Sequence, residues 1–276
     1  MMDIRSSGNR ARCQRWRMKQ KVLVPDYFKT KKKESRLKYG GAKHYSNELL
    51  SDTVREPKEG EYLLQASHLI LPHPTTLVIT GPSQSGKTVL ATRLIRFRNQ
   101  MFTENIEELR WYYGRGQKFH RKLQEEFPEM MFIQGEPDPD DWDENVKRLI
   151  IIDDLMDRMG KTISSIFTKD SHHTNTSAIY ITQNLFSPQR GTRTSNINSH
   201  FLIVMKSPKD TLTVNNIQKQ MFTGIAPGFL QSVYRHATAK PHSYISISGD
   251  QYTDNNLRVR TQIFPDEDNY IYTPKN

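Results

Sequence analysis

The sequence predicts an α/β fold, a three-layer sandwich in which helices cover both faces of a mostly parallel central sheet. Two observations lead to this prediction. From residue 62 onward, short apolar runs alternate with longer amphipathic stretches, as in chains built from repeated strand–helix units. The run at residues 149–152 is apolar at every position, which is typical of a central parallel strand buried on both faces. With 276 residues, the chain is long enough to bury a substantial core.

The expected elements follow in chain order. A strand at residues 77–80 precedes a helix at 88–102, in which apolar residues recur at helical spacing. Further core strands are expected at residues 109–113, 149–153, 178–182 and 201–205, with helices at 119–127 and from 154 to about 170. Residues 244–248 and 259–264 alternate with period two, which predicts peripheral strands.

Composition and charge exclude several classes of protein. No apolar run approaches the ~18 residues that a membrane-spanning helix needs, so we expect no membrane partner. The single cysteine, Cys13, excludes a disulfide scaffold and any site built from several cysteines. The basic N-terminal segment has no apolar stretch like that of a secretory signal. We therefore expect an intracellular protein.

The formal net charge of +10 is concentrated at one end of the chain. Residues 1–43 hold 14 Lys/Arg and 3 Asp/Glu, whereas the rest of the chain is nearly neutral. Lysines and arginines that neutralise phosphates release counterions, so this segment predicts a polyanionic partner. A localisation signal within the same segment is the alternative, and it is compatible with DNA binding.

The motif with the clearest chemistry lies at residues 81–88, GPSQSGKT, which match G-x-x-x-x-G-K-[ST] at every fixed position. A predicted strand ends just before it and a predicted helix opens just after it. Backbone N–H groups of such a loop surround phosphates, and the helix N-terminus adds its positive dipole end. We expect ATP to contact Gly81, Pro82, Ser83, Gln84, Ser85, Gly86, Lys87 and Thr88. Lys87 would reach the β- and γ-phosphates, and the Thr88 hydroxyl would bind Mg²⁺.

Two carboxylates and an amide complete the predicted site. The buried strand at residues 149–153 ends in Asp153, which we expect on the Mg²⁺, and Asp154 is expected to orient or deprotonate the attacking water. An aspartate pair that caps the next helix is the alternative. Gln183, at the tip of the following strand, is expected to sense the γ-phosphate or position water, the alternative being a turn residue.

Four segments in this order, GPSQSGKT, RLIIIDDLMD, SIFTKDSHHTNTSAIYITQNLF and RTSNINSHFLIVMKSPKD, resemble the genome-packaging ATPases of the FtsK–HerA superfamily. The resemblance covers roughly residues 70–220 and points to the type found in Polinton/adintovirus-like elements and poxvirus-type viruses. It implies a RecA-like P-loop NTPase core, a homo-oligomeric ring and translocation of double-stranded DNA into a capsid. It supports Gln183 as the sensor. The Asp-Asp pair departs from the Asp-Glu pair that is commoner in such ATPases.

Composition and periodicity, rather than the resemblance, set the expected organisation of the chain, because the resemblance covers neither the basic tail nor the segment after about residue 225. Residues 1–60 are expected to be a basic, largely disordered tail and linker, residues 61–264 the P-loop ATPase domain, and residues 265–276 a loose acidic tail. Capsid proteins are further candidate partners, and the host nucleus or cytoplasm, or the virion, is the expected location. Ring ATPases commonly complete each site with a neighbour's arginine. Arg193 is our first candidate for that role and Arg190 the second, and two solvated loop arginines are the alternative.

Two other functions remain open from the sequence. A nucleoside or nucleotide kinase shares the phosphate loop and the acidic strand end, and it would use Arg115, Lys118, Arg121 and Lys122 as a lid; an ordinary solvated helix face explains these residues equally well. A DNA-binding or capsid-associated protein without hydrolytic activity would use the fold as a scaffold. The intact Lys87, Thr88 and Asp153 argue against that scaffold.

Overall fold

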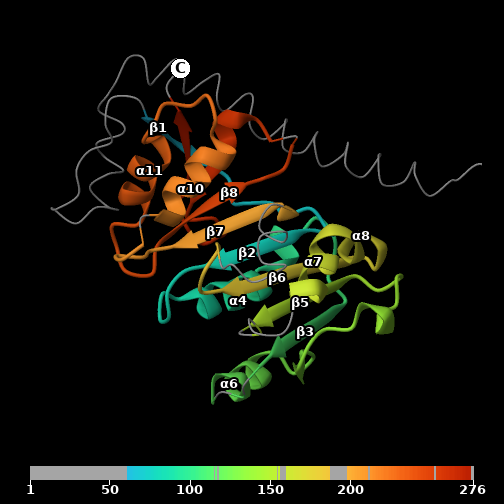
Figure 1. The fold of residues 1–276 in the computed structure, drawn as a ribbon. Coiled ribbons are helices and arrows are strands. Elements are labelled where there is room, and N and C mark those ends of the chain that lie inside the picture. The colour runs from blue at the N-terminus through green and yellow to red at the C-terminus, as the bar shows by residue number, and fades with distance from the viewer. Residues whose placement is uncertain are drawn as a thin grey trace, which may run out of the picture.

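The structure is a computed structural model that describes residues 61–274, except residues 115, 117, 154, 156–159, 187–197, 211 and 252. The prediction of a tail and linker at residues 1–60 therefore lies outside the described residues. Within the described part, all strands join one mixed sheet in the order β1-β10-β9-β8-β7-β2-β6-β5-β3-β4 (Figure 1).

The half of the sheet from β7 to β4 is entirely parallel. Its strands are β2 (Thr76–Thr80), β3 (Glu108–Tyr113), β4 (Met131–Gln134), β5 (Arg148–Asp153), β6 (Thr176–Thr182) and β7 (Phe201–Met205). Every residue of β2, β5, β6 and β7 is buried, because helices cover both faces of a parallel sheet. The predicted core strands are confirmed to within two residues at each end, and β4 is an addition that we did not predict.

The other half of the sheet is antiparallel. Its strands are β8 (Tyr244–Ser248), β9 (Val259–Thr261), β10 (Asn269–Pro274) and β1 (Glu61–Ala66). The expectation of a loose tail at residues 265–276 is wrong for residues 269–274. Residues 269–273 are buried, and β10 pairs with β1 on one side and β9 on the other. The predicted strand at residues 259–264 ends early, because Gln262 takes a left-handed φ of 53° that an extended strand does not tolerate.

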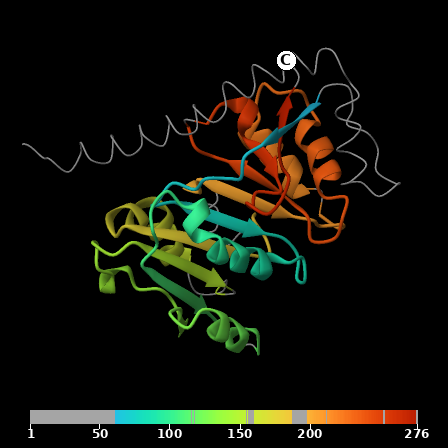
Figure 2. The same cartoon turned by 180° about the vertical axis from the view of Figure 1, so that it is seen from behind.

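Helices form a layer on each face of the sheet, as the opposite views in Figures 1 and 2 show. One layer contains α4 (Lys87–Arg96), α5 (Arg98–Met101) and α6 (Lys118–Glu126). The other contains α7 (Gly160–Ser165), a π-helix (Ile166–Asp170), α8 (Ser171–His173), α10 (Leu212–Met221) and α11 (Phe229–Ala237). Short 3₁₀ turns lie at Pro139–Asp141 and Asn255–Leu257. Among the described helices, none is both long and apolar enough to cross a membrane.

Alternating residues of the strands supply two separate cores. On β2, Leu77 and Ile79 pack with α4, while Val78 packs with the helices of the opposite layer. This period-two division is what burial of both faces requires. The predicted three-layer α/β sandwich is therefore confirmed. The helix expected at residues 88–102 is interrupted at Phe97, whose backbone leaves the helical region between α4 and α5.

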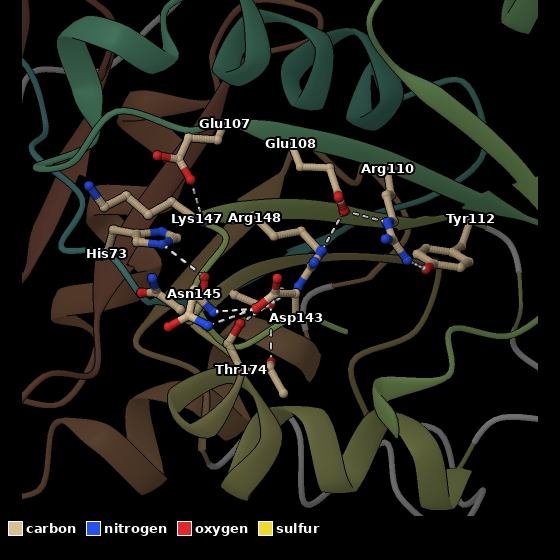
Figure 3. A network of polar contacts seen from close by, with 12 residues as sticks. His73, Glu107, Glu108, Arg110, Tyr112, Asp143, Asn145, Lys147, Arg148 and Thr174 are labelled. Atoms are coloured by element: carbon tan, nitrogen blue, oxygen red, sulfur yellow. Dashed lines mark hydrogen bonds and ion pairs between the residues drawn. The ribbon is translucent and has the colours of Figure 1, made fainter. Parts of the chain in front are cut away.

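A polar network joins the starting ends of three parallel strands, at the edge of the sheet opposite the phosphate loop (Figure 3). Arg148 is 1% exposed. It donates hydrogen bonds to Glu108 on β3 and, at 3.3 Å, to Thr176 Oγ1 on β6. Arg110 donates to the same carboxylate. Burial alone would raise the pKa of Glu108, but the hydrogen bonds from Arg148 and Arg110 outweigh it and hold this pKa below its ordinary value.

We expect Arg148→Ala to lower the free energy of unfolding by about 3 kcal/mol, because it removes a buried side chain together with its hydrogen bonds to Glu108 and Thr176. The exposed pair Arg96–Glu126 supplies the control, and Arg96→Ala should lower it by about 0.5 kcal/mol. Urea unfolding at pH 7 measures both effects. Equal effects of the two substitutions would contradict a structural role for the buried network.

The pKa of Glu108 also predicts a pH dependence. A carboxyl group whose pKa is lowered by folding stabilises the protein above its unfolded pKa, near 4.5, and this contribution disappears as the pH falls through the folded pKa. Below pH 4.5, the wild-type protein should therefore lose stability more steeply than Glu108→Gln does. Parallel slopes for the two proteins between pH 5 and pH 3 would refute the assignment.

Candidate nucleotide-binding site

The predicted site residues meet because β6 lies between β2 and β5. In the parallel register, Thr80 is level with Thr182, and Asp153 is level with Ile181. The phosphate loop, the acidic strand end and the residue after β6 therefore emerge at one edge of the sheet. Ligands of open α/β sheets bind at this carboxyl edge. In the RecA-like arrangement, one strand separates the strand before the phosphate loop from the strand that ends in the acidic residue. Here β6 separates β2 from β5, so the predicted RecA-like P-loop NTPase fold is confirmed.

The phosphate loop has the backbone shape that its glycines permit. Gly81 and Gly86 have positive φ values of 156° and 100°, and Gly86 is the N-cap of α4. The loop is joined to β6 by a hydrogen bond from Gly81 N to Thr182 O of 3.3 Å. A Cβ atom on Gly81 would lie 2.7 Å from Met205 Cβ on β7. Glycine is therefore required at position 81 by space as well as by conformation.

The loop encloses polar groups that suit a phosphate. Lys87 is 9% exposed, and its Nζ donates to the carbonyl oxygens of Gly81 and Pro82 at 2.7 and 2.8 Å. The ammonium group thus lies inside the loop, where an arriving phosphate would exchange with the carbonyls. Ser85 Oγ is buried without a hydrogen-bond partner among the described residues. A buried hydroxyl without a hydrogen-bond partner is destabilising. A hydrogen bond from this hydroxyl to a phosphate oxygen would offset that cost.

The chain also offers oxygen ligands suited to Mg²⁺. Thr88 is half-buried in the first turn of α4, and Asp153 is 8% exposed at the end of β5. Mg²⁺ usually takes one or two protein oxygens and completes its shell with phosphates and water. A hydroxyl and a carboxylate beside a phosphate loop fit that requirement.

Gln183, the predicted sensor, lies beside the phosphate loop. It is exposed just after β6, and its Oε1 accepts a hydrogen bond of 3.4 Å from Ser83 Oγ of the phosphate loop. The neighbouring Asn184 is occupied differently, since its Oδ1 accepts a hydrogen bond from Phe186 N at 3.0 Å. The structure thus brings Gln183 to the loop and uses Asn184 to shape the turn. The predictions for Asp154, Arg190 and Arg193 fall on residues outside the described part, and they stay predictions.

The structure also shows a cavity that the motifs did not indicate. It has a volume of about 650 Å³, which is typical of small-molecule sites, and it opens from Lys87 and Thr88 toward α11 and strands β8–β10. His242 forms part of its wall and donates from Nδ1 to Ser85 O of the phosphate loop at 3.2 Å. The two residues are 157 positions apart, so no local sequence pattern could associate them.

Comparison with solved structures finds proteins of low similarity. The genome packaging NTPase B204 from Sulfolobus turreted icosahedral virus 2, in complex with AMPPCP, is 11% identical with a TM-score of 0.45 over 68% of this chain and 96% of that chain. The same NTPase with sulfate is 12% identical with a TM-score of 0.43, over 68% and 95%. The KaiC-like protein PH0186 from Pyrococcus horikoshii OT3 is 12% identical with a TM-score of 0.41, over 77% and 100%.

No protein-family model matches the chain. No curated protein matches it either. The fold assignment accordingly rests on the strand order and loop geometry of the chain itself.

The close approach of Gly81 to β7 can be tested directly. We expect Gly81→Ala to weaken nucleotide binding at least tenfold, because the added Cβ must displace the loop from Met205. Gly135→Ala is the matched control: Gly135 also has a positive φ, of 124°, but a Cβ there meets nothing within 4 Å. It should lower the free energy of unfolding by about 1 kcal/mol and leave nucleotide affinity unchanged. Titration with a fluorescent ATP analogue distinguishes the two, and equal affinities would contradict the steric argument.

Proposed function

We propose that this chain is an ATPase that moves double-stranded DNA, in a homo-oligomeric ring, and packages the genome of a virus or a Polinton/adintovirus-like element into a capsid. The observation that carries the hydrolytic part is the convergence of Lys87, Asp153 and Gln183 at the carboxyl edge of β2, β5 and β6. A phosphate-binding cation, a metal-binding carboxylate and a water-positioning amide are the groups that phosphoryl transfer to water needs.

Each residue has a distinct role in the proposed reaction. Water attacks the γ-phosphorus while the bond to the β-phosphate oxygen breaks, and ADP departs. Lys87 offsets the charge that develops on the phosphate oxygens, and Gln183 aligns the water. Thr88 and Asp153 would hold Mg²⁺, which would supply positive charge against the phosphates. Asp154 is the proposed acceptor of the proton from the water.

The DNA-moving part of the proposal is supported by the sequence. The basic residues concentrated in 1–43 suit a polyanion, and the four motif segments resemble packaging ATPases. Arg193 is the proposed trans arginine that would couple neighbouring subunits, and capsid proteins are the proposed docking partners. The proposed kinase lid gains no support, since Arg121 and Lys122 are exposed on α6 and line no part of the cavity.

Two substitutions test the chemistry. We expect Lys87→Ala to lower the turnover of ATP by about 10²–10³-fold, as removal of a preorganised charge-stabilising group does, and to weaken ATP binding. Asp154→Asn should retain ATP binding and lose turnover, because it removes only the proton acceptor. Lys122→Ala is the control, being an exposed lysine remote from the loop. Normal turnover by Asp154→Asn would show that another residue holds the water.

Dependence on DNA tests the motor. Phosphate release should rise when duplex DNA is added to the full chain, with no phosphate transferred to nucleosides. Removal of residues 1–44 should weaken duplex binding and flatten its salt dependence, because fewer counterions are released, while basal hydrolysis persists. Phosphate transfer to a nucleoside would instead identify a kinase. Hydrolysis that ignores DNA would contradict the motor.

A further inference from the structure

The cavity beside the phosphate loop is lined by parts of the chain that phosphate binding does not use. Val89 and Arg93 of α4 lie on one side, and Pro241, Tyr244 and Tyr272 belong to the opposite wall. Lys87 and Thr88 line it too, so the cavity is continuous with the proposed phosphate site. A nucleotide held by its phosphates there would extend its nucleoside end into this volume.

One amide in the cavity wall has hydrogen-bonding capacity that the protein does not use. Gln262 lines the cavity, and its Oε1 is buried with no hydrogen-bond partner in the described part of the chain. No partner among the described residues fixes the orientation of this amide, so it can turn either its carbonyl or its NH₂ toward a ligand. A buried amide left unsatisfied is destabilising, which is a reason to expect that a ligand completes it.

The backbone around the cavity is held in unusual conformations. Four described non-glycine residues have a positive φ, and three of them, Gln84, His242 and Gln262, line this cavity. Such conformations persist where surrounding structure holds them, and they cluster at ligand sites. The turn that carries His242 is held by Lys206, whose Nζ donates to Ala239 O at 2.6 Å and whose N–H donates to Ser243 O at 2.9 Å.

The chemistry of the wall discriminates between purines. An amide presents one donor and one acceptor, which match the 6-amino group and N7 of adenine, whereas guanine offers two acceptors along the same edge and is matched by arginine. The arginine of this wall, Arg93, is already engaged, because its guanidinium pairs with Glu267 and Asp266. Gln262 is thus a wall group suited to binding the base, and the base that its amide matches is adenine.

We propose that the cavity between α4 and strands β8–β10 is the nucleobase pocket and that Gln262 recognises the 6-amino edge of adenine. This inference rests on the proposed function for the phosphate end of the site. It adds a specificity-determining residue from the C-terminal part of the chain, a segment that carries none of the nucleotide-binding motifs.

The test compares ATP with purine riboside triphosphate, which lacks only the 6-amino group, by equilibrium binding to the full chain. The wild-type protein should bind ATP about tenfold more tightly, within the range that a good amide–adenine pair supplies. Gln262→Met has nearly the same shape and should lose this preference. Its affinity for purine riboside triphosphate should fall less than its affinity for ATP, because that nucleotide keeps N7 and lacks only the 6-amino group. Binding that remains shows that the variant is folded. Gln251→Met, at an exposed glutamine, is the matched control and should keep the preference.

The outcomes separate this inference from the proposed function. Retention of the full ATP preference by Gln262→Met, or tighter binding of GTP than of ATP by the wild type, would overturn the role of Gln262 and leave hydrolysis intact. A Gln262-dependent preference in a protein that binds ATP without hydrolysing it would support the pocket and overturn the ATPase. Failure of the wild type to bind any nucleotide would overturn both.

Discussion

The site depends on the hydrogen-bonded position of β6 between β2 and β5. Parallel pairing on both sides of β6 makes the ends of three strands level, and a bond from Gly81 to Thr182 extends that pairing into the phosphate loop. Because parallel register is set by burial on both faces, the apolar residues of these strands also determine where the phosphate loop, Asp153 and Gln183 lie. The chemistry is thus positioned by rigid strands rather than by the loops that carry it.

The two edges of the parallel sheet differ in how their polar groups are paired. At the starting edge, Arg148 is buried and its charge is matched by Glu108, so this edge is joined by a satisfied ion pair (Figure 3). At the carboxyl edge, Lys87 bonds to loop carbonyls and Ser85 Oγ is unsatisfied. A buried hydroxyl without a partner among the described residues is available to a ligand, whereas the groups of a closed ion pair are not.

Sequence reasoning located the parts of the site that are contiguous in the chain. The phosphate loop was readable because its glycines, lysine and threonine occupy one segment between a strand and a helix, and Asp153 was readable because an apolar run precedes it. The bounds of the central strands could be predicted because a strand buried on both faces is a continuous apolar run. The interruption of the first helix at Phe97 was not, since no glycine or proline marks it.

The C-terminal strand and the cavity wall were missed for a physical reason. Residues 269–274 follow an acidic run and mix polar with aromatic side chains, a composition that resembles a surface tail. Their burial follows from pairing with β1, whose residues lie some 200 positions earlier in the chain. Contacts of that separation leave no periodic signal within a window of sequence. The cavity has the same origin, because α4 and the turn at His242 meet only when the antiparallel half of the sheet is complete.

The acidic residues near the C-terminus therefore belong to the same folded unit as the phosphate loop. Asp266 and Glu267 pair with Arg93 on α4, the helix whose first turn carries Lys87 and Thr88. The guanidinium of Arg93 also lies 4.0 Å from the ring centroid of Phe264, which adds a cation–π contact to the ion pairs. These contacts hold α4 to the segment between β9 and β10 and shape the wall opposite the phosphate loop. A boundary at residue 264 would separate the helix that carries Lys87 and Thr88 from the carboxylates that fix its position, so the folded unit extends to β10.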